Sequence, residues 1–321
     1  MKRKFTGLIF TVLTIPLLAM SVRGAERLIP VGEVIGLELR SGTVTVAAFD
    51  DSLTAARDAG LRIGDEILSV DDVSVDSAED VRAALTHSDG AVDLVVSRGG
   101  ETQTIHMEPE ITAAGPKLGV YLRQGITGIG TVTFYDPESG DFGALGHAVS
   151  DNKGNLLKMT RGSAYPASIV SVEKGKSGQP GQLKGTLKSD RLLGTLTGNT
   201  ARGIFGNTLE GWTGEAIPVA AFDEIRTGEA TIRSTINGSA PCDYSVEILK
   251  IYPEDRADGR NLLIRATDPT LLKTTGGIVQ GMSGSPIIQD GKLVGAVTHV
   301  LVNDPTRGYG IFIENMLEAA G

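Results

Sequence analysis

Short runs of apolar and β-branched residues, each ended by turn residues, recur from about residue 116 to the C-terminus. Runs of this length and composition are typical of β-strands. The chain has 42 Gly among its 321 residues, and glycine supplies the tight turns that many short strands require. About 200 residues of short strands favour a β-barrel or paired barrels, so the chain is predicted to be mainly β.

The first 25 residues have the composition of an export signal. Basic residues at positions 2–4 precede an apolar stretch that ends near Val22. A charged start followed by an apolar core is typical of a signal peptide, and Ala19-Met20-Ser21 offers a cleavage site. The stretch is also at the short limit for spanning a bilayer. Residues 1–25 are therefore predicted to be a signal peptide or a membrane anchor, and the rest of the chain to work outside the cytoplasm.

Charge and cysteine content exclude several classes of function. The net charge is −9, and an acidic chain has no long-range attraction for phosphate backbones, so nucleic acid is not expected as a partner. The single cysteine, Cys242, excludes an intrachain disulfide and a multi-cysteine zinc site. It is predicted to be a small buried or half-buried residue. Because His, Asp and Glu show no ligand spacing, neither a metal nor a cofactor is expected.

Residues 31–110 are predicted to form one small domain. The run from Ala59 to Leu68, Ala-Gly-Leu-Arg-Ile-Gly-Asp-Glu-Ile-Leu, resembles the characteristic stretch of a PDZ domain, and a helix is expected from about Ser77 to Leu85. PDZ domains bind extended peptides by adding a strand beside an exposed edge. The helix is expected to form one wall of this groove, with a peptide ligand or the protein's own chain as the partner. A PDZ domain used only as a structural clamp is the alternative. The resemblance implies that the carboxylate loop and edge strand are Ile35, Gly36, Leu37, Glu38 and Leu39.

The sharpest chemical feature is the run Gly-Met-Ser-Gly-Ser-Pro at residues 281–286. Its pattern, G-x-S-G-x-P, is similar to the nucleophile loop of trypsin-like peptidases, where a serine projects from a tight turn. Glycine on either side of Ser283 lets the backbone turn sharply and lets a substrate carbonyl approach. The N–H groups of Gly281 and Ser283 are predicted to form the oxyanion hole, which stabilises developing negative charge. A plain turn between strands is the alternative.

A serine nucleophile requires a base, and the chain has four histidines. His87 and His106 lie in the PDZ segment, where exposed surface positions are expected. His147 precedes Ser283, as the catalytic histidine does in trypsin-like enzymes, and it is predicted to be the base. His299 follows the nucleophile loop within an apolar strand and is the rival candidate.

The third member of a triad is a carboxylate that orients the imidazole. Asp268, Asp151 and Asp304 are the candidates, and spacing alone does not choose among them.

Several stretches together resemble the SpoIVB peptidase family of spore-forming bacteria. They are Gly128–Pro137, Phe142–His147, Gly277–Ile288 and Gly295–Gly310. The resemblance spans the PDZ segment and a peptidase segment at 116–321, in the family's order. It implies a PDZ domain followed by a trypsin-like double β-barrel, and it implies the triad His147, Asp268 and Ser283.

The resemblance also implies a biological role. Members of this family are narrow-specificity endopeptidases that process themselves and act between the mother-cell and forespore membranes. They cleave a membrane-bound regulator and so lead to activation of a late sigma factor. The residues by themselves support only export, a peptide-binding module and a serine-peptidase constellation. The rival interpretations are a non-catalytic PDZ adaptor with a degenerate peptidase domain and a hydrolase of small esters.

Overall fold

The structure is a computed structural model that describes residues 27–88, 90–151, 154–208, 210–252 and 258–321. The signal peptide or anchor predicted at residues 1–25 lies outside these ranges. Within them, no helix is both long and apolar enough to cross a membrane.

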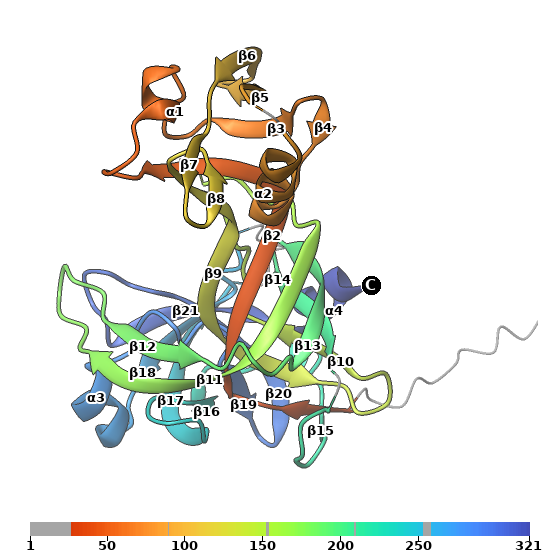
Figure 1. Ribbon diagram of the computed structural model, residues 1–321. Coiled ribbons are helices and arrows are strands. Elements are labelled where there is room, and N and C mark those ends of the chain that lie inside the picture. Colours follow the sequence, from red (N-terminus) through yellow and green to blue (C-terminus); the bar gives the residue numbers. More distant parts are fainter. Residues whose placement is uncertain (1–26, 89, 152–153, 209, 253–257) are drawn as a thin grey trace, which may run out of the picture.

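Six antiparallel strands close into a first barrel (Figure 1). Its core is built from apolar side chains that include Leu37, Val132, Phe142 and Ile204. Around the ring, each strand pairs with the next and the last returns to the first: β2 (Val34–Phe49), β9 (Val120–Tyr135), β10 (Asp141–Ala144), β14 (Gly203–Thr208), β13 (Gly194–Thr200) and β11 (Arg161–Glu173). Three short strands extend it: β1 (Arg27–Pro30), β12 (Gln182–Leu187) and β15 (Ile217–Pro218).

A second six-stranded barrel follows in the chain. Its interior is filled by Ile232, Ile248, Ile264 and Ile287, all fully buried. Its ring consists of β16 (Gly228–Ser234), β17 (Cys242–Ile251), β18 (Leu262–Ala266), β21 (Arg307–Phe312), β20 (Lys292–Val300) and β19 (Pro286–Gln289). Short helices flank it: η1 (Phe222–Glu224), α3 (Pro269–Thr275) and α4 (Ile313–Ala320). The two closed rings confirm the prediction of a mainly β, double-barrel fold.

Cys242 is exposed, so the prediction that it is buried or half-buried was wrong. The residue begins β17 opposite Ser234, and the first two residues of β17 both lie exposed before the strand enters the barrel.

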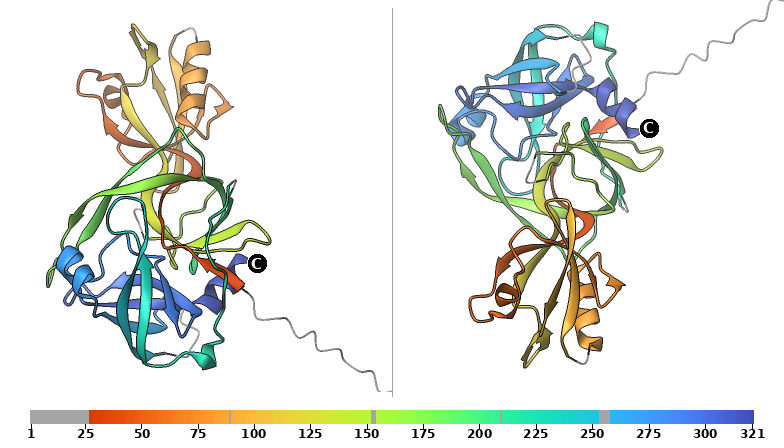
Figure 2. Two further views of the ribbon diagram at one scale, coloured as in Figure 1. Left: turned by 90° about the horizontal axis from the view of Figure 1, so that it is seen from below. Right: turned by 90° about the horizontal axis from the view of Figure 1, so that it is seen from above.

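The PDZ unit has a separate core, formed by Val44, Ile67, Leu94 and other buried side chains. Figure 2 shows this unit standing off from the two barrels. Besides the outer parts of β2 and β9, it contains α1 (Ala55–Asp58), β3 (Glu66–Val70), β4 (Val73–Ser74), α2 (Ala78–His87), β5 (Val92–Arg98), β6 (Glu101–Met107), β7 (Glu110–Thr112) and β8 (Gly115–Lys117).

The PDZ unit is inserted within the first barrel and does not precede it as a separate domain. β2 and β9 are both 16 residues long and pair along each other from the barrel into the PDZ unit. Residues 34–40 belong to the barrel and residues 44–49 to the PDZ unit. The predicted boundary at residue 31 is therefore corrected, because one continuous strand serves both units.

The same pairing corrects the predicted PDZ groove. Ile35, Gly36, Leu37, Glu38 and Leu39 pair with β9 on one side and with β11 on the other. A strand with a partner on each side has no free edge to offer a peptide. These five residues therefore cannot be the edge strand of the PDZ unit.

The insertion predicts where the PDZ unit can be removed. Arg40 and Gly125 are directly paired, so replacing residues 41–124 by Asn-Gly closes β2 and β9 as a hairpin. We expect this variant to keep a cooperative thermal unfolding transition. Deleting residues 31–110 removes the barrel half of β2, and we expect that variant not to fold. Thermal unfolding of both variants would be followed by circular dichroism. A cooperative transition in the variant without residues 31–110, and none in the variant without residues 41–124, would contradict the insertion.

Candidate active site

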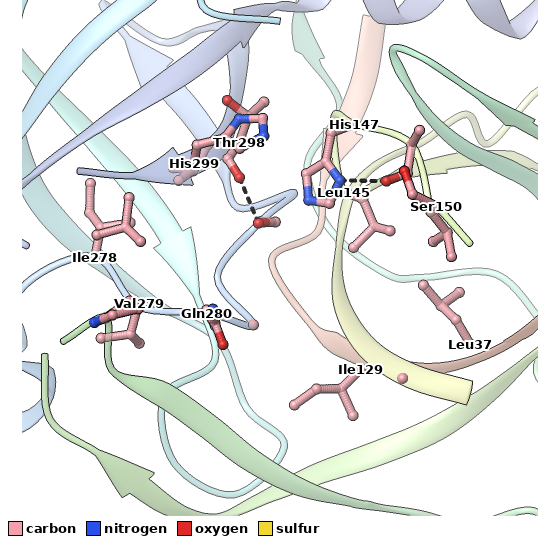
Figure 3. Close-up of a pocket in the computed structure, with 18 of the residues that line it drawn as sticks. Leu37, Ile129, Leu145, His147, Ser150, Ile278, Val279, Gln280, Thr298 and His299 are labelled. Atoms are coloured by element: carbon pink, nitrogen blue, oxygen red, sulfur yellow. Dashed lines mark hydrogen bonds between the residues drawn. The ribbon is translucent and has the colours of Figure 1, made fainter. Parts of the chain in front are cut away.

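A cleft with a volume of 530 Å³ lies between the two barrels and contains the predicted nucleophile and base. The first barrel contributes His147, and the second contributes Ser283 and His299. Figure 3 shows the two imidazoles side by side at one end, with Ile278 and Val279 on one flank and Leu37 on the other. The structure thus brings together residues that are far apart in the sequence.

Ser283 projects from a turn that only glycine can form comfortably. Gly281 and Gly284 have φ angles of +98° and +96°, in the region that L side chains rarely adopt. A Cβ at Gly284 would lie 2.0 Å from the carbonyl oxygen of Thr131. The glycine pattern that identified this loop therefore has a steric cause.

Two threonines of β9 hold the turn in place. The hydroxyl of Thr131 donates to the carbonyl of Gly281 at 2.9 Å, and that of Thr133 donates to the carbonyl of Gly284 at 2.8 Å. The backbone N–H of Thr131 also donates to the carbonyl of Ser283 at 3.1 Å. The carbonyls of Gly281, Ser283 and Gly284 thus point toward the first barrel.

The N–H groups of Met282, Gly284 and Ser285 donate to carbonyls of Val279, Val297 and Met282. In the part of the chain that the structure describes, the N–H groups of Gly281 and Ser283 donate to no protein carbonyl. Free N–H groups beside a serine hydroxyl are what an oxyanion hole needs. The N–H groups of Gly281 and Ser283 are therefore available to bind an oxyanion, as predicted donors must be.

The hydroxyl of Ser283 donates to the carbonyl of Thr298 at 2.7 Å. The hydroxyl proton, which a base would have to remove, is therefore engaged by the carbonyl of Thr298. Attack on a substrate would therefore require the hydroxyl to turn from Thr298 toward an imidazole.

His147 is presented by a sharp turn just after β10. Leu145 and Gly146 both have positive φ, at 68° and 69°. Its Nδ1 lies 2.8 Å from the carbonyl oxygen of Ala148. A carbonyl oxygen only accepts, so Nδ1 carries the proton and Nε2 is left with a free lone pair. Burial lowers the pKa of His147, and the bond to Ala148 offsets only part of this effect, so the ring is neutral near pH 7.

His299 stands beside His147, with ring centroids 5.3 Å apart. Its buried Nδ1 has no hydrogen-bond partner among the described residues. Burial, together with the neighbouring His147 and Arg260, lowers the pKa of His299 to about 4. A ring with so low a pKa is a weak base, which favours His147 for proton transfer.

No hydrogen bond joins Asp268 to His147 among the described residues, and its predicted role as the orienting carboxylate is corrected. The residue is the N-cap of α3, where its side chain accepts from the N–H groups of Thr270 and Leu271. It is not among the residues that line the cleft. The position that a triad carboxylate would occupy at Nδ1 is taken by the carbonyl of Ala148.

The other two candidate carboxylates also stabilise local turns. Asp151 accepts from the N–H of Asn155, and Asp304 accepts from Thr306 and Arg307. Within the described ranges, no three His, Cys, Asp or Glu side chains are grouped in a way that could hold a metal ion.

Comparison with protein-family models matches residues 115–317 to the SpoIVB peptidase S55 family and residues 54–98 to the PDZ domain. The first match covers more than half of the chain. The chain belongs to the SpoIVB peptidase family. It is therefore a PDZ-containing serine peptidase.

Other comparisons add less to this family assignment. The search of curated proteins found no match. Among solved structures, the active form of the Rv3671c protease from M. tuberculosis is 16% identical and has a TM-score of 0.37, covering 62% of this chain and 75% of that chain. The inactive form of the Rv3671c protease is 15% identical and has a TM-score of 0.35, covering 61% and 85%. The double-barrel fold of this SpoIVB-family chain is established by its own strand pairing.

Three positioning residues of the site were missed from the sequence. Besides Thr131 and Thr133, Asn199 clamps the loop that follows His147. Its Oδ1 accepts from the N–H of Val149 at 2.9 Å, and its Nδ2 donates to the carbonyls of Val149 and Leu157. Asn199 lies in the glycine-rich stretch 198–206, whose only local signal was that of a turn.

The cleft wall is apolar and uncharged. Leu37 and Leu39, which were predicted for the PDZ groove, line the catalytic cleft instead. Ile278, Val279 and Val300 also line it, and none of the lining residues is Asp, Glu, Lys or Arg. The SpoIVB-family cleft of this chain is therefore suited to uncharged, largely apolar peptide segments.

The open edge of the PDZ unit is the beginning of β9. Residues 120–123 pair with residues 45–49 of β2 on one side and, within the described ranges, with no strand on the other. α2 lies next to this segment, and Gln124 accepts from the N–H of Ala78 at the start of α2. The open edge of the PDZ unit thus lies beside α2, so the strand predicted for the groove is corrected, and α2 as a groove wall stays a prediction.

The lowered pKa of His147 predicts the pH dependence of the reaction. A base must be neutral, so activity is lost as the pH falls through its pKa in the folded protein. We expect the acid limb of fluorophosphonate labelling to lie below about pH 6.5, the ordinary value for a free imidazole. A limb near pH 4 that disappears in His299→Ala would instead identify His299 as the base.

Thr131 offers a test of the clamp on the nucleophile loop. The change Thr131→Val keeps the size of the buried side chain and leaves the partly buried carbonyl of Gly281 unpaired. An unpaired buried carbonyl costs about 1–3 kcal/mol. We expect a loss of kcat of about tenfold or more, with KM little changed. The matched control is Thr127→Val on the exposed part of β9, and equal kcat values in the two variants would contradict the clamp.

Proposed function

We propose that this SpoIVB-family peptidase is an exported serine endopeptidase in which Ser283 is the nucleophile and His147 is the general base. One observation carries the proposal: the two barrels bring Ser283 and a neutral, pre-oriented His147 into a single cleft. The Nε2 of His147 is the free acceptor that a serine hydroxyl needs.

The reaction follows from these positions. The hydroxyl of Ser283 leaves the carbonyl of Thr298 and gives its proton to Nε2 of His147 as Oγ attacks the scissile carbonyl carbon. The N–H groups of Gly281 and Ser283 stabilise the resulting oxyanion. When the C–N bond breaks, the imidazolium returns the proton to the leaving amine. Water then attacks the acyl-enzyme by the same proton transfers in reverse and releases Ser283.

In this mechanism Asp268 is a positioning residue. Its cap fixes α3, and the chain runs from α3 directly into Ile278, Val279 and the nucleophile loop. Loss of an N-cap typically costs about 0.5–2 kcal/mol, which would loosen one wall of the cleft.

The biological role that we propose is that of the family. The enzyme cleaves a membrane-associated regulatory protein with narrow specificity, in the intercompartmental signalling that activates a sigma factor during sporulation, and it processes itself. Family membership and the export-type first 25 residues support this role. The N-terminal segment would place the enzyme in the space between the forespore membranes, either free or anchored.

A second candidate is a non-catalytic PDZ adaptor with a degenerate peptidase domain. The specific observation that favours it is the bond from Ser283 to the carbonyl of Thr298, which leaves the hydroxyl unpaired with His147. The adaptor would bind peptides through the PDZ unit and leave them intact.

The deciding experiment is labelling of the full chain by a fluorophosphonate probe, with Ser283→Ala as the control. We expect labelling at Ser283 that is lost in Ser283→Ala and falls by at least about 1000-fold in His147→Ala. A folded chain without labelling or self-cleavage would favour the adaptor.

The role of Asp268 is tested in the same assay by two substitutions. Asparagine caps helices about as well as aspartate, so we expect Asp268→Asn to keep most of the labelling rate. Asp268→Ala should lower both the rate and the unfolding temperature. A loss of about 10⁴-fold in Asp268→Asn, without a change in unfolding temperature, would restore Asp268 as the triad carboxylate.

A further inference from the structure

The strand β9 runs from the PDZ unit into the first barrel (Figure 1), and one of its edges is open over much of its length. On one side β9 pairs with β2 from Val120 to Thr131, and β1 continues that side at Phe134 and Tyr135. On the other side it pairs with β10, and only at residues 132–135. Between residues 120 and 130, that second side has no strand partner within the described ranges.

The direction of the backbone groups shows which residues face the open side. The N–H of Val132 donates to Glu33, next to β2, and the N–H of Thr131 donates to Ser283 on the opposite side. Backbone groups alternate along an antiparallel strand, so those of Ile129, Thr127 and Gly125 face away from β2. The register between β2 and β9 is regular over this stretch.

The open edge is accessible. Thr127 and Gly128 are exposed, and a Cβ built on Gly128 would meet no atom within 4 Å. Ile126, Gly128 and Ile129 also line the catalytic cleft. The edge therefore enters the cleft directly, and it ends where Thr131 bonds the backbone of the nucleophile.

We infer that an extended polypeptide substrate adds to β9 as an antiparallel strand, with its C-terminal carboxylate at the start of β9 and its scissile bond at Ser283. This inference rests on the proposed function. Gly119, with a φ of +76°, forms the turn before β9, where backbone N–H groups can capture a carboxylate. The antiparallel direction then takes the upstream part of the substrate along β9 toward Thr131.

This arrangement sets a distance between the cleavage site and the C-terminus. Paired strands advance together at about 3.3 Å per residue, so the peptide uses one residue for each residue of β9. From Val120 to Thr131 the edge spans about ten to twelve residues. The enzyme is therefore expected to remove a C-terminal segment of about ten to twelve residues from an uncharged, apolar stretch.

Cleavage of a peptide pool tests the distance. The probe is a set of 24-residue peptides, randomised among uncharged residues and ending in a free carboxylate, and the matched pool ends in an amide. With the full chain, we expect mass spectrometry to find C-terminal products concentrated at ten to twelve residues for the carboxylate pool. The amide pool should be cut at least about fivefold more slowly and without a preferred length. Similar product lengths from both pools, or cleavage of neither by a chain that the probe labels, would overturn the inference.

Binding to the Ser283→Ala chain tests the docking without catalysis. Thr127→Pro removes an outward N–H and spares the ladder with β2, whereas Thr127→Val keeps that N–H. We expect Thr127→Pro to weaken binding of the fluorescent 24-residue carboxylate pool by about fivefold, the effect of one net hydrogen bond. Six-residue peptides with the C-terminal sequences of this pool should bind equally well to the chains with and without Thr127→Pro. Equal binding of the long pool by the proline and valine variants refutes docking along β9.

The two experiments separate the inference from the proposed function. A chain that binds the long pool through β9 but is never labelled at Ser283 refutes the peptidase mechanism and keeps the docking surface. A chain that is labelled but cuts without regard to the C-terminus refutes the inference and keeps the mechanism.

Discussion

The pairing of β2 with β9 is the interaction on which the rest of the molecule depends. The two strands form part of the first barrel, continue into the PDZ unit and support its sheet, so neither unit has a complete sheet without them. A flexible linker would allow a PDZ unit to move independently of its catalytic domain. Two hydrogen-bonded strands instead fix the position of the PDZ unit relative to the barrel. Their register cannot shift, because sliding either strand by one residue would turn its buried face outward. The open edge of the PDZ unit and the loop that carries Ser283 are therefore held at a fixed separation along one strand, β9.

The chemistry of the nucleophile loop depends on where its carbonyls go. A tight turn has as many acceptors as donors, and an oxyanion hole requires the donors to be free and the acceptors to be satisfied. Thr131 and Thr133 satisfy the acceptors from β9, which is the same strand that leads to the PDZ groove. Substrate that pairs with β9 would thus contact the strand that holds the loop. This places recognition and the geometry of the oxyanion hole on one element.

The sequence was sufficient for features whose signal is local. The glycines around Ser283 are required by positive φ, and the alternation of short apolar runs predicted a mainly β chain. The roles that depend on distant contacts were not readable. Residues Ile35–Leu39 resemble a PDZ edge strand because they belong to β2, the strand that continues into the PDZ unit. Only the pairing with β11 shows that this part of β2 has no free edge. Asn199, for example, forms hydrogen bonds with Leu157 and Val149, which precede it by 42 and 50 positions in the sequence. Asp268 differs, because aspartate before proline is a helix N-cap signal that the family resemblance outweighed.

The partner of His147 has a consequence for how such an enzyme achieves its rate. The carbonyl of Ala148 fixes the tautomer as a carboxylate would, but it carries only a partial charge. In the proposed mechanism His147 takes the proton of Ser283, and the imidazolium then forms in a buried site that already disfavours charge. A full carboxylate would stabilise that ion much more strongly. The transition state must then be stabilised by other contacts, and binding energy from remote parts of a long substrate can serve that purpose. A short peptide lacks those contacts, so dependence on an extended substrate gives narrow specificity without a discriminating pocket at the scissile bond.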